Sequence, residues 1–243
     1  MRLVGAAQVF ADELVRLREC LRNTPGLSPV GAAVTIPRIL LISGSTREGS
    51  TNTAALRSIA ADAGSDFEAV RYQGLLDLPA FMPGDEPEPP VVEALHRQLA
   101  EVDAVLFCTP EYAGMIPGSL KNLLEWTIGN ADLSDKPVAY VNVAYEGRGE
   151  AAVATLRTVL GYAGARLVEA ACGRITVLQS SIGPDGVVAD ADARIRLNAA
   201  ARTLAAHVAP HDLEHLVAGM QIEQRKPVPE RTREQNIRID DAP

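Results

Sequence analysis

Short apolar runs alternate with helical patterns from Arg38 to Ala209, and this alternation limits the folds open to the chain. The predicted strands are Arg38–Ser43, Phe67–Tyr72, Ala104–Thr109, Val138–Val143 and Leu167–Val177, the last interrupted at Gly173. The predicted helices are Thr53–Ala63, Pro90–Glu101, Pro117–Asn130, Glu150–Ala163 and Asp192–His207. Runs such as AVLFC and VAYVNV are apolar throughout, which indicates strands buried on both faces. The pattern predicts an α/β fold, a doubly wound five-stranded parallel sheet with helices on both faces.

The chain divides by composition into three predicted parts. Residues 1–37 form an N-terminal extension, an amphipathic helix at Ala6–Leu21 followed by a linker rich in Pro and Gly. Residues 38–209 form the α/β domain. Residues 210–243 read as a polar C-terminal tail with little apolar surface to bury.

Charge and hydropathy narrow the class of protein. The net charge of −8 disfavours a general nucleic-acid binder, which needs a basic face. No apolar run approaches the roughly 18 residues of a membrane span. Cys20, Cys108 and Cys172 form no CxxC pair, which is typical of a reducing compartment. We expect a cytoplasmic protein without nucleic-acid or membrane partners.

The segment GSTREGSTN, Gly44 to Asn52, has the composition of a phosphate-binding loop. It follows a predicted strand and precedes a predicted helix, whose N-terminus attracts anions. Arg47 supplies a planar charged fork, and Ser45, Thr46, Ser50, Thr51 and Asn52 supply further donors. The alternative is a plain helix cap at Ser50 or Thr51 with a solvated Arg47.

The spacing excludes two commoner phosphate motifs. No lysine follows Gly49, as a P-loop requires, and Gly44 lacks the second glycine of a dinucleotide fingerprint. A monophosphate fits hydroxyls and one arginine better than a pyrophosphate does.

Loops after two further strands are expected at the same edge of the sheet. After the third strand, Tyr112 is placed to border a planar ligand, and the backbone amides of Glu111, Tyr112 and Ala113 are candidate donors to it. The fourth-strand loop, Tyr145 to Glu150, contains Arg148, which faces either a ligand or solvent. An ordinary surface turn is the alternative for Tyr112.

These motifs resemble those of the NADPH-dependent FMN reductase family, a flavodoxin-like group that includes quinone, azo-dye and chromate reductases. The pattern G-S-x-R-x-x-S-x-N occurs at Gly44–Asn52. The pattern P-E-Y-N-x-x-x-P-G-x-L-K-N occurs at Pro110–Asn122, with Ala113 in place of its asparagine. The resemblance covers about Arg38 to His207.

The resemblance implies strand order 2-1-3-4-5, noncovalent FMN, NADPH or NADH as donor, and a homodimer or homotetramer built on helices near Pro117–Trp126. It implies hydride transfer to FMN N5 and onward to a flavin, quinone or similar small acceptor. No protein residue is then catalytic, and no metal is needed. The implied cofactor-binding residues are Ser45, Arg47, Ser50, Thr51, Asn52, Thr53, Pro110, Glu111, Tyr112, Ala113, Gly114, Gly147 and Arg148.

Two departures from the family pattern concern the expected flavin ring. Ala113 removes a polar side chain, and the fourth-strand loop carries both Glu146 and Arg148. Glu146 near the ring would disfavour an anionic reduced flavin, whereas Arg148 would favour it. Arg148 is also the one sequence candidate for the 2′-phosphate of NADPH.

Two other functions remain compatible with the sequence. One is a non-enzymatic electron carrier of the flavodoxin type, and the other is a flavin-binding scaffold that uses its extensions to bind a protein. The scarcity of aromatic residues around the expected ring favours the enzyme. His207, His211 and His215 recur every four residues, but Pro210 breaks the helical spacing that a metal site would need.

Overall fold

A parallel sheet organises the part of the chain that the computed structural model describes, residues 36–84 and 87–208. Its strand order is β2-β1-β3-β4-β5, as the resemblance implied. The predicted helix at Ala6–Leu21 and the tail at 210–243 lie outside the described residues, so the three-part division of the chain stays a prediction.

Predicted and observed elements agree closely in position. The strands are β1 Arg38–Ser43, β2 Glu68–Arg71, β3 Ala104–Cys108, β4 Pro137–Asn142, β5 Arg166–Leu167 and β6 Gly173–Arg174. The α-helices are α2 Thr51–Ala61, α3 Pro90–Ala100, α4 Gly118–Gly129, α5 Glu150–Tyr162 and α6 Ala191–Val208. Two short 3₁₀ helices follow, η1 Glu169–Ala171 and η2 Gln179–Ser181.

The fifth strand differs from the prediction. Its interruption lies before Gly173, where η1 separates β5 from β6. Both short strands pair in parallel with β4. Strand β5 pairs with Pro137 and Val138 of β4, and β6 pairs with Val141 and Asn142. The outer position of the sheet is therefore filled by two pieces of chain.

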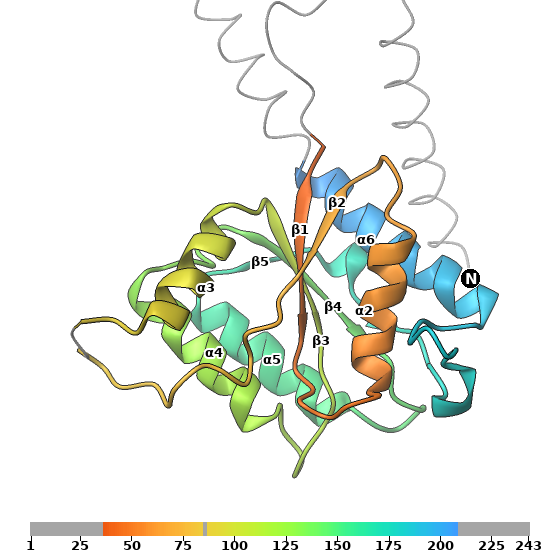
Figure 1. The fold of residues 1–243 in the computed structure, drawn as a ribbon, viewed down its shortest axis with the longest axis horizontal. Helices are drawn as coiled ribbons and strands as arrows, with labels where there is room; N and C mark the ends of the chain where they lie inside the picture. Colours follow the sequence, from red (N-terminus) through yellow and green to blue (C-terminus); the bar gives the residue numbers. More distant parts are fainter. Residues whose placement is uncertain (1–35, 85–86, 209–243) are drawn as a thin grey trace, which may run out of the picture. The chain divides into compact units, whose positions relative to one another are not determined.

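Alternating side chains of the central strands bury both faces of the sheet. In β1, Ile39 and Leu41 belong to the core beneath α2 and α6, whereas Leu40 and Ile42 belong to the core beneath α3, α4 and α5. Figure 1 shows these helices on opposite sides of the strands. Because parallel strands need crossover helices, all the strand-to-helix loops lie at one edge of the sheet.

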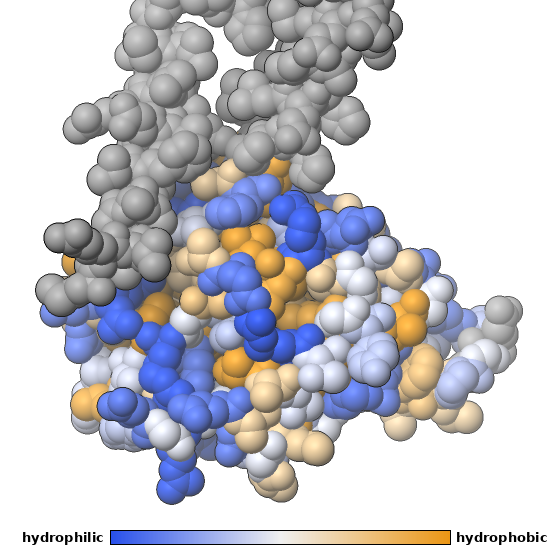
Figure 2. All heavy atoms as spheres, turned by 180° about the vertical axis from the view of Figure 1, so that it is seen from behind, coloured by the Kyte–Doolittle hydropathy of each residue, from blue (hydrophilic) through white to orange (hydrophobic). Residues whose placement is uncertain are grey.

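The face of the molecule opposite to that in Figure 1 carries both hydrophilic and hydrophobic side chains. Hydrophilic side chains surround a central hydrophobic patch in Figure 2. None of the helices in the described ranges has both the length and the apolar character needed to cross a membrane.

The segment after β2 is held by the polar side chains of α4. Asn122 Nδ2 donates to the Pro79 carbonyl at 2.8 Å, and its Oδ1 accepts from the Phe81 amide at 2.7 Å. Trp126 donates to the same carbonyl and packs edge-to-face on Phe81, with ring centroids 5.0 Å apart. Asn122 and Trp126 therefore stabilise contacts within the chain.

We predict that Phe107→Ala lowers the free energy of unfolding by about 3–5 kcal/mol, because Phe107 is fully buried in the central strand β3. Tyr162→Ala is the control, since Tyr162 is 87% exposed, and it should change stability by less than about 0.5 kcal/mol. Chemical denaturation measures both values. Equal effects would contradict the placement of β3 in the core.

Candidate functional site

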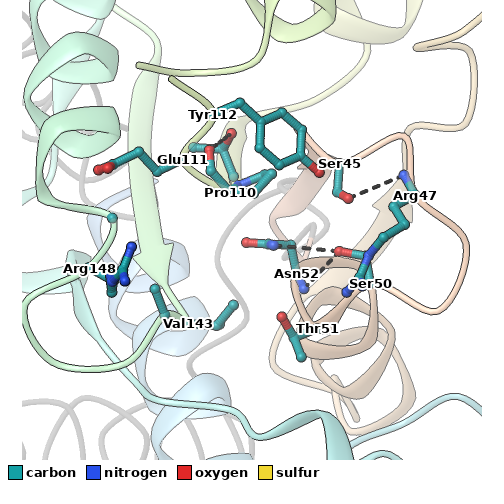
Figure 3. A pocket seen from close by; sticks show the side chains of 13 residues that line it. Ser45, Arg47, Ser50, Thr51, Asn52, Pro110, Glu111, Tyr112, Val143 and Arg148 are labelled. Carbon is teal, nitrogen blue, oxygen red and sulfur yellow. Dashed lines mark hydrogen bonds between the residues drawn. The ribbon is translucent and has the colours of Figure 1, made fainter. Parts of the chain in front are cut away.

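Loops after β1, β3 and β4 enclose a cleft of about 350 Å³ at the carboxyl edge of the sheet. Figure 3 shows α2 and its preceding loop on one side, and Val143 and Arg148 on the other. Pro110 and Tyr112 lie between them. The full lining is Ser45, Arg47, Ser50, Thr51, Asn52, Thr109, Pro110, Glu111, Tyr112, Val143, Ala144, Arg148 and Gly149. This first cleft lies where β1 and β3 diverge into opposite crossovers, the usual ligand position in such sheets.

Gly44 allows the first two loops to approach each other closely. A Cβ atom at Gly44 would lie 2.3 Å from Thr109 Oγ1, far inside van der Waals contact. The Gly44 amide donates to the Cys108 carbonyl at 2.9 Å. Glycine is therefore required by packing at the start of the first loop.

Ser50 and Asn52 are buried at the N-terminus of α2. Ser50 is the N-cap, and its Oγ accepts from the Asn52 amide at 3.2 Å. Asn52 Oδ1 accepts from the Cys108 thiol at 3.3 Å. Burial raises the pKa of the Cys108 thiol, so this thiol stays protonated and remains a donor. Both side chains are thereby fixed at the wall of the cleft.

Arg47 is held by a residue distant in sequence, Gln179 of η2. Gln179 Oε1 accepts from Arg47 Nη2 at 3.2 Å, and Gln179 Nε2 donates to the Gly49 carbonyl at 3.0 Å. One amide side chain thus holds both the arginine and the loop that carries it. Because the Gln179 amide is neutral, it does not offset the positive charge of the guanidinium.

Two helix N-termini border the cleft, and they differ in electrostatics. The first turn of α2 carries no acidic residue, so the positive end of its dipole is uncompensated. At α5, Glu111 accepts from the Ala151 and Ala152 amides at 3.0 and 3.2 Å, and Glu150 lies in the first turn. An anion entering the cleft is therefore attracted to α2, beside Arg47.

The third-strand loop is a two-residue hairpin. Tyr112 and Met115 exchange backbone hydrogen bonds, Tyr112 N–H to Met115 C=O at 2.9 Å and the reverse at 3.0 Å. Ala113 and Gly114 have φ of +50° and +74°, as a type I′ turn requires. The expectation that the Tyr112 amide is free for a ligand is therefore wrong, because the hairpin uses it.

Arg174 of β6 shapes the fourth-strand loop. Its guanidinium donates to the carbonyls of Ala144, Tyr145 and Arg148. Gly149 has φ of +78°, and a Cβ atom there would lie 2.7 Å from Asn142 Oδ1. In this arrangement Arg148 lines the cleft and Glu146 does not.

Most of the sequence-predicted site residues meet at the cleft, and four do not. Thr53 forms a hydrogen bond with Ser43 between the two hydroxyls, 2.9 Å apart, and lines a different cleft. Ala113, Gly114 and Gly147 are turn residues outside the lining. The sequence analysis missed Thr109, Val143, Ala144 and Gly149. The first three lie at or just after a predicted strand end, and Gly149 directly precedes a predicted helix.

The described histidines lie away from the cleft. His96 forms hydrogen bonds with Asp132 at 2.6 Å and Glu88 at 3.0 Å. His207 Nδ1 lies 2.8 Å from the Thr203 carbonyl oxygen. His211 and His215 are outside the described residues.

The strand order and the cleft at the β1/β3 edge define a flavodoxin-like protein. A family model described as NADPH-dependent FMN reductase matches residues 37–173. The chain therefore belongs to the NADPH-dependent FMN reductase family, as its two motifs indicated. The description of the family agrees with the class of enzyme and the cofactors expected from the sequence.

Individual relatives are similar to this chain over part of its length. The quinone reductase of Escherichia coli strain K12 is 32% identical over 105 residues, which are 42% of this chain and 54% of that protein. The chain thus spans about half the length of that relative. The 2-hydroxy-1,4-benzoquinone reductase of Burkholderia sp. is 33% identical over 130 residues, covering 51% of this chain and 70% of that protein.

A solved structure shares the fold. FerB from Paracoccus denitrificans, a flavoenzyme NAD(P)H:(acceptor) oxidoreductase, superposes with a TM-score of 0.60 at 23% identity. The match covers 72% of this chain and 99% of FerB.

We predict that Ala113→Gly raises the free energy of unfolding by about 0.5–1 kcal/mol, because it relieves a left-handed backbone at a non-glycine residue. Ala154→Gly in the middle of α5 is the matched control, and it should lower stability by a similar amount. Thermal or chemical unfolding of both variants checks the opposite signs. A loss of stability in both would exclude the type I′ turn.

Proposed function

We propose that this chain is an FMN-dependent NAD(P)H oxidoreductase that passes electrons from NADPH or NADH to a flavin, quinone or similar small acceptor. The observation that carries the proposal is the pairing of Arg47 with an uncompensated helix N-terminus in a cleft also bordered by the third-strand and fourth-strand loops. Quinone and benzoquinone reductases among the relatives support the class of acceptor.

The phosphate of FMN fits the side of the cleft formed by α2. The Ser45 and Ser50 hydroxyls and the Arg47 guanidinium line this side, and the first turn of α2 adds N–H groups that have no partner inside the helix. Thr51 and Asn52 complete it. Hydroxyls, amides and one fixed cation suit a phosphate monoester, so the residues present fit this group.

The flavin ring fits the side formed by the other two loops. Pro110 and Val143 supply apolar surface, and Tyr112 supplies a half-exposed aromatic ring. The Glu111 and Ala113 amides are the candidate donors to the ring edge, since hairpin pairing uses the Tyr112 amide. The cleft of about 350 Å³ lies within the usual size of a small-ligand site.

Bound FMN would supply the redox chemistry, accepting a hydride from the nicotinamide and passing the electrons to the acceptor. The chain's own groups then bind and orient. Glu111 is engaged by the α5 N-terminus and positions the fourth-strand loop against the third. Arg148 places positive charge at the cleft wall, which would stabilise negative charge developing on a ligand there.

The remaining predictions concern assembly and location. A homodimer or homotetramer stays a prediction, and so does a cytoplasmic location. The electron-carrier and scaffold functions are separated from the enzyme by the experiment below.

We predict that the purified protein, supplied with FMN, shows flavin absorption bands that bleach on anaerobic addition of NADPH or NADH. A free quinone should then restore the bands without a protein partner, because the acceptor needs only the open cleft. Bands that neither nucleotide bleaches would favour the electron carrier. A protein that takes up no FMN would contradict the proposed function altogether.

We predict that Arg47→Gln weakens FMN binding by about 10-fold to 100-fold, the range of a lost charge-assisted hydrogen bond. Riboflavin lacks the phosphate, so its dissociation constant should change little. Arg97→Gln is the matched control, because Arg97 is exposed on α3 and away from the cleft. Equal losses for FMN and riboflavin would show that Arg47 does not contact the phosphate.

A further inference from the structure

A second, larger cleft lies against the same phosphate-binding loop. Its volume is about 530 Å³, and Ser45, Arg47 and Ser50 line both clefts. The rest of its lining comes from α2, the end of β2 with the segment after it, and the chain between η2 and α6. Most of its lining therefore differs from that of the first cleft, and the two clefts share the loop after β1.

Three arginines line the second cleft. Arg57 projects from α2 and Arg71 ends β2, and both side chains are exposed like that of Arg47. Within the described residues, none of the three forms an ion pair with a carboxylate. Glu48 is the one acidic residue in the lining, so positive charge is in excess there.

The guanidinium of Arg57 lies beside Gly186. Gly186 lies in the chain between η2 and α6, and a Cβ atom on it would come within 2.5 Å of Arg57 Nη1. The φ of Gly186 is +76°, which also favours glycine. The exposed Arg57 side chain thus reaches the segment between η2 and α6 at the cleft wall.

Apolar side chains share the lining of the second cleft with these charges. Leu75, Leu76 and Ile182 line it together with Tyr72, and Leu76 is 73% exposed. Burial raises the pKa of the Tyr72 phenol to about 12, with a further contribution from Asp77, so the hydroxyl stays protonated and can donate. The cleft thus offers guanidinium groups for phosphate and a hydrophobic surface for a planar base.

We propose that the second cleft binds the adenosine end of NADPH, with Arg57 and Arg71 holding its 2′-phosphate. The proposal rests on the proposed function, because NADPH must also reach the first cleft. Guanidinium forks match phosphate geometry, and two of them beyond Arg47 exceed what one FMN phosphate needs. Arg148, the sequence candidate for this role, is a single arginine on the far side of the first cleft.

The kinetic test compares the donors in the double variant Arg57→Gln/Arg71→Gln. The KM for NADPH should rise about 10-fold to 100-fold, while the KM for NADH and the dissociation constant of FMN change less than about twofold. Arg97→Gln is the matched control and should leave all three unchanged. A rise in the FMN dissociation constant with no change for NADPH would assign the arginines to FMN and overturn the proposal. A comparable rise in the KM for NADPH, with that for NADH unchanged, in Arg148→Gln but not in the double variant would also overturn it.

A binding test works even if the oxidoreductase activity is absent. Calorimetric titration of the FMN-loaded protein with 2′,5′-ADP and with 5′-AMP isolates the 2′-phosphate. We expect 2′,5′-ADP to bind more tightly, and the double variant to lose that difference. Equal binding of the two probes to the unmodified chain would overturn the second-cleft proposal while leaving the FMN proposal intact. Conversely, the protein could bind 2′,5′-ADP more tightly than 5′-AMP and yet not be reduced by NADPH. That result would reject the proposed oxidoreductase function and leave the second-cleft proposal intact.

Discussion

Burial of both faces of β1 and β3 is the constraint on which the rest of this structure depends. Ile39 and Leu41 point to one core and Leu40 and Ile42 to the other, so helices must cover both sides of the sheet. Parallel strands covered in this way are joined by crossovers, which bring every strand-to-helix loop to the carboxyl edge. The loops after β1, β3 and β4 therefore meet there, although 100 residues separate Gly44 from Ala144 in sequence.

Within that edge, the distribution of acidic residues makes the N-terminus of α2 more favourable for an anion than that of α5. Both α2 and α5 direct their N-termini toward the cleft, but Glu111 neutralises only that of α5. The α2 end keeps its positive character and gains Arg47, which Gln179 holds in place. The same loop lines the second cleft together with Arg57 and Arg71, so one segment of chain borders both clefts that we propose to bind phosphate groups.

Short sequence patterns were sufficient to predict most of the fold and much of the cleft lining. The apolar patterns predicted the first four strands to within one residue at each end, but not the division of the fifth into β5 and β6. The consecutive donors of GSTREGSTN indicated a loop between β1 and α2 that lines the cleft, and its binding of phosphate stays a proposal. Contacts between distant segments were not predictable. Gln179 reaches Arg47 across 132 residues, and Arg174 organises a loop 26 or more residues away. The sequence singled out Ala113 because it lacks the polar side chain of the family pattern, and it gave no sign of the positive φ that the structure shows there.

The central claim is that three loops form one flavin mononucleotide site. Hydrogen–deuterium exchange of the protein with and without FMN tests this claim most directly, because it reports on each loop separately. Our account predicts slower amide exchange on FMN binding in the loops at 44–52, 109–115 and 143–151, and little change in α3. Protection confined to one loop, or located in α3, would contradict it.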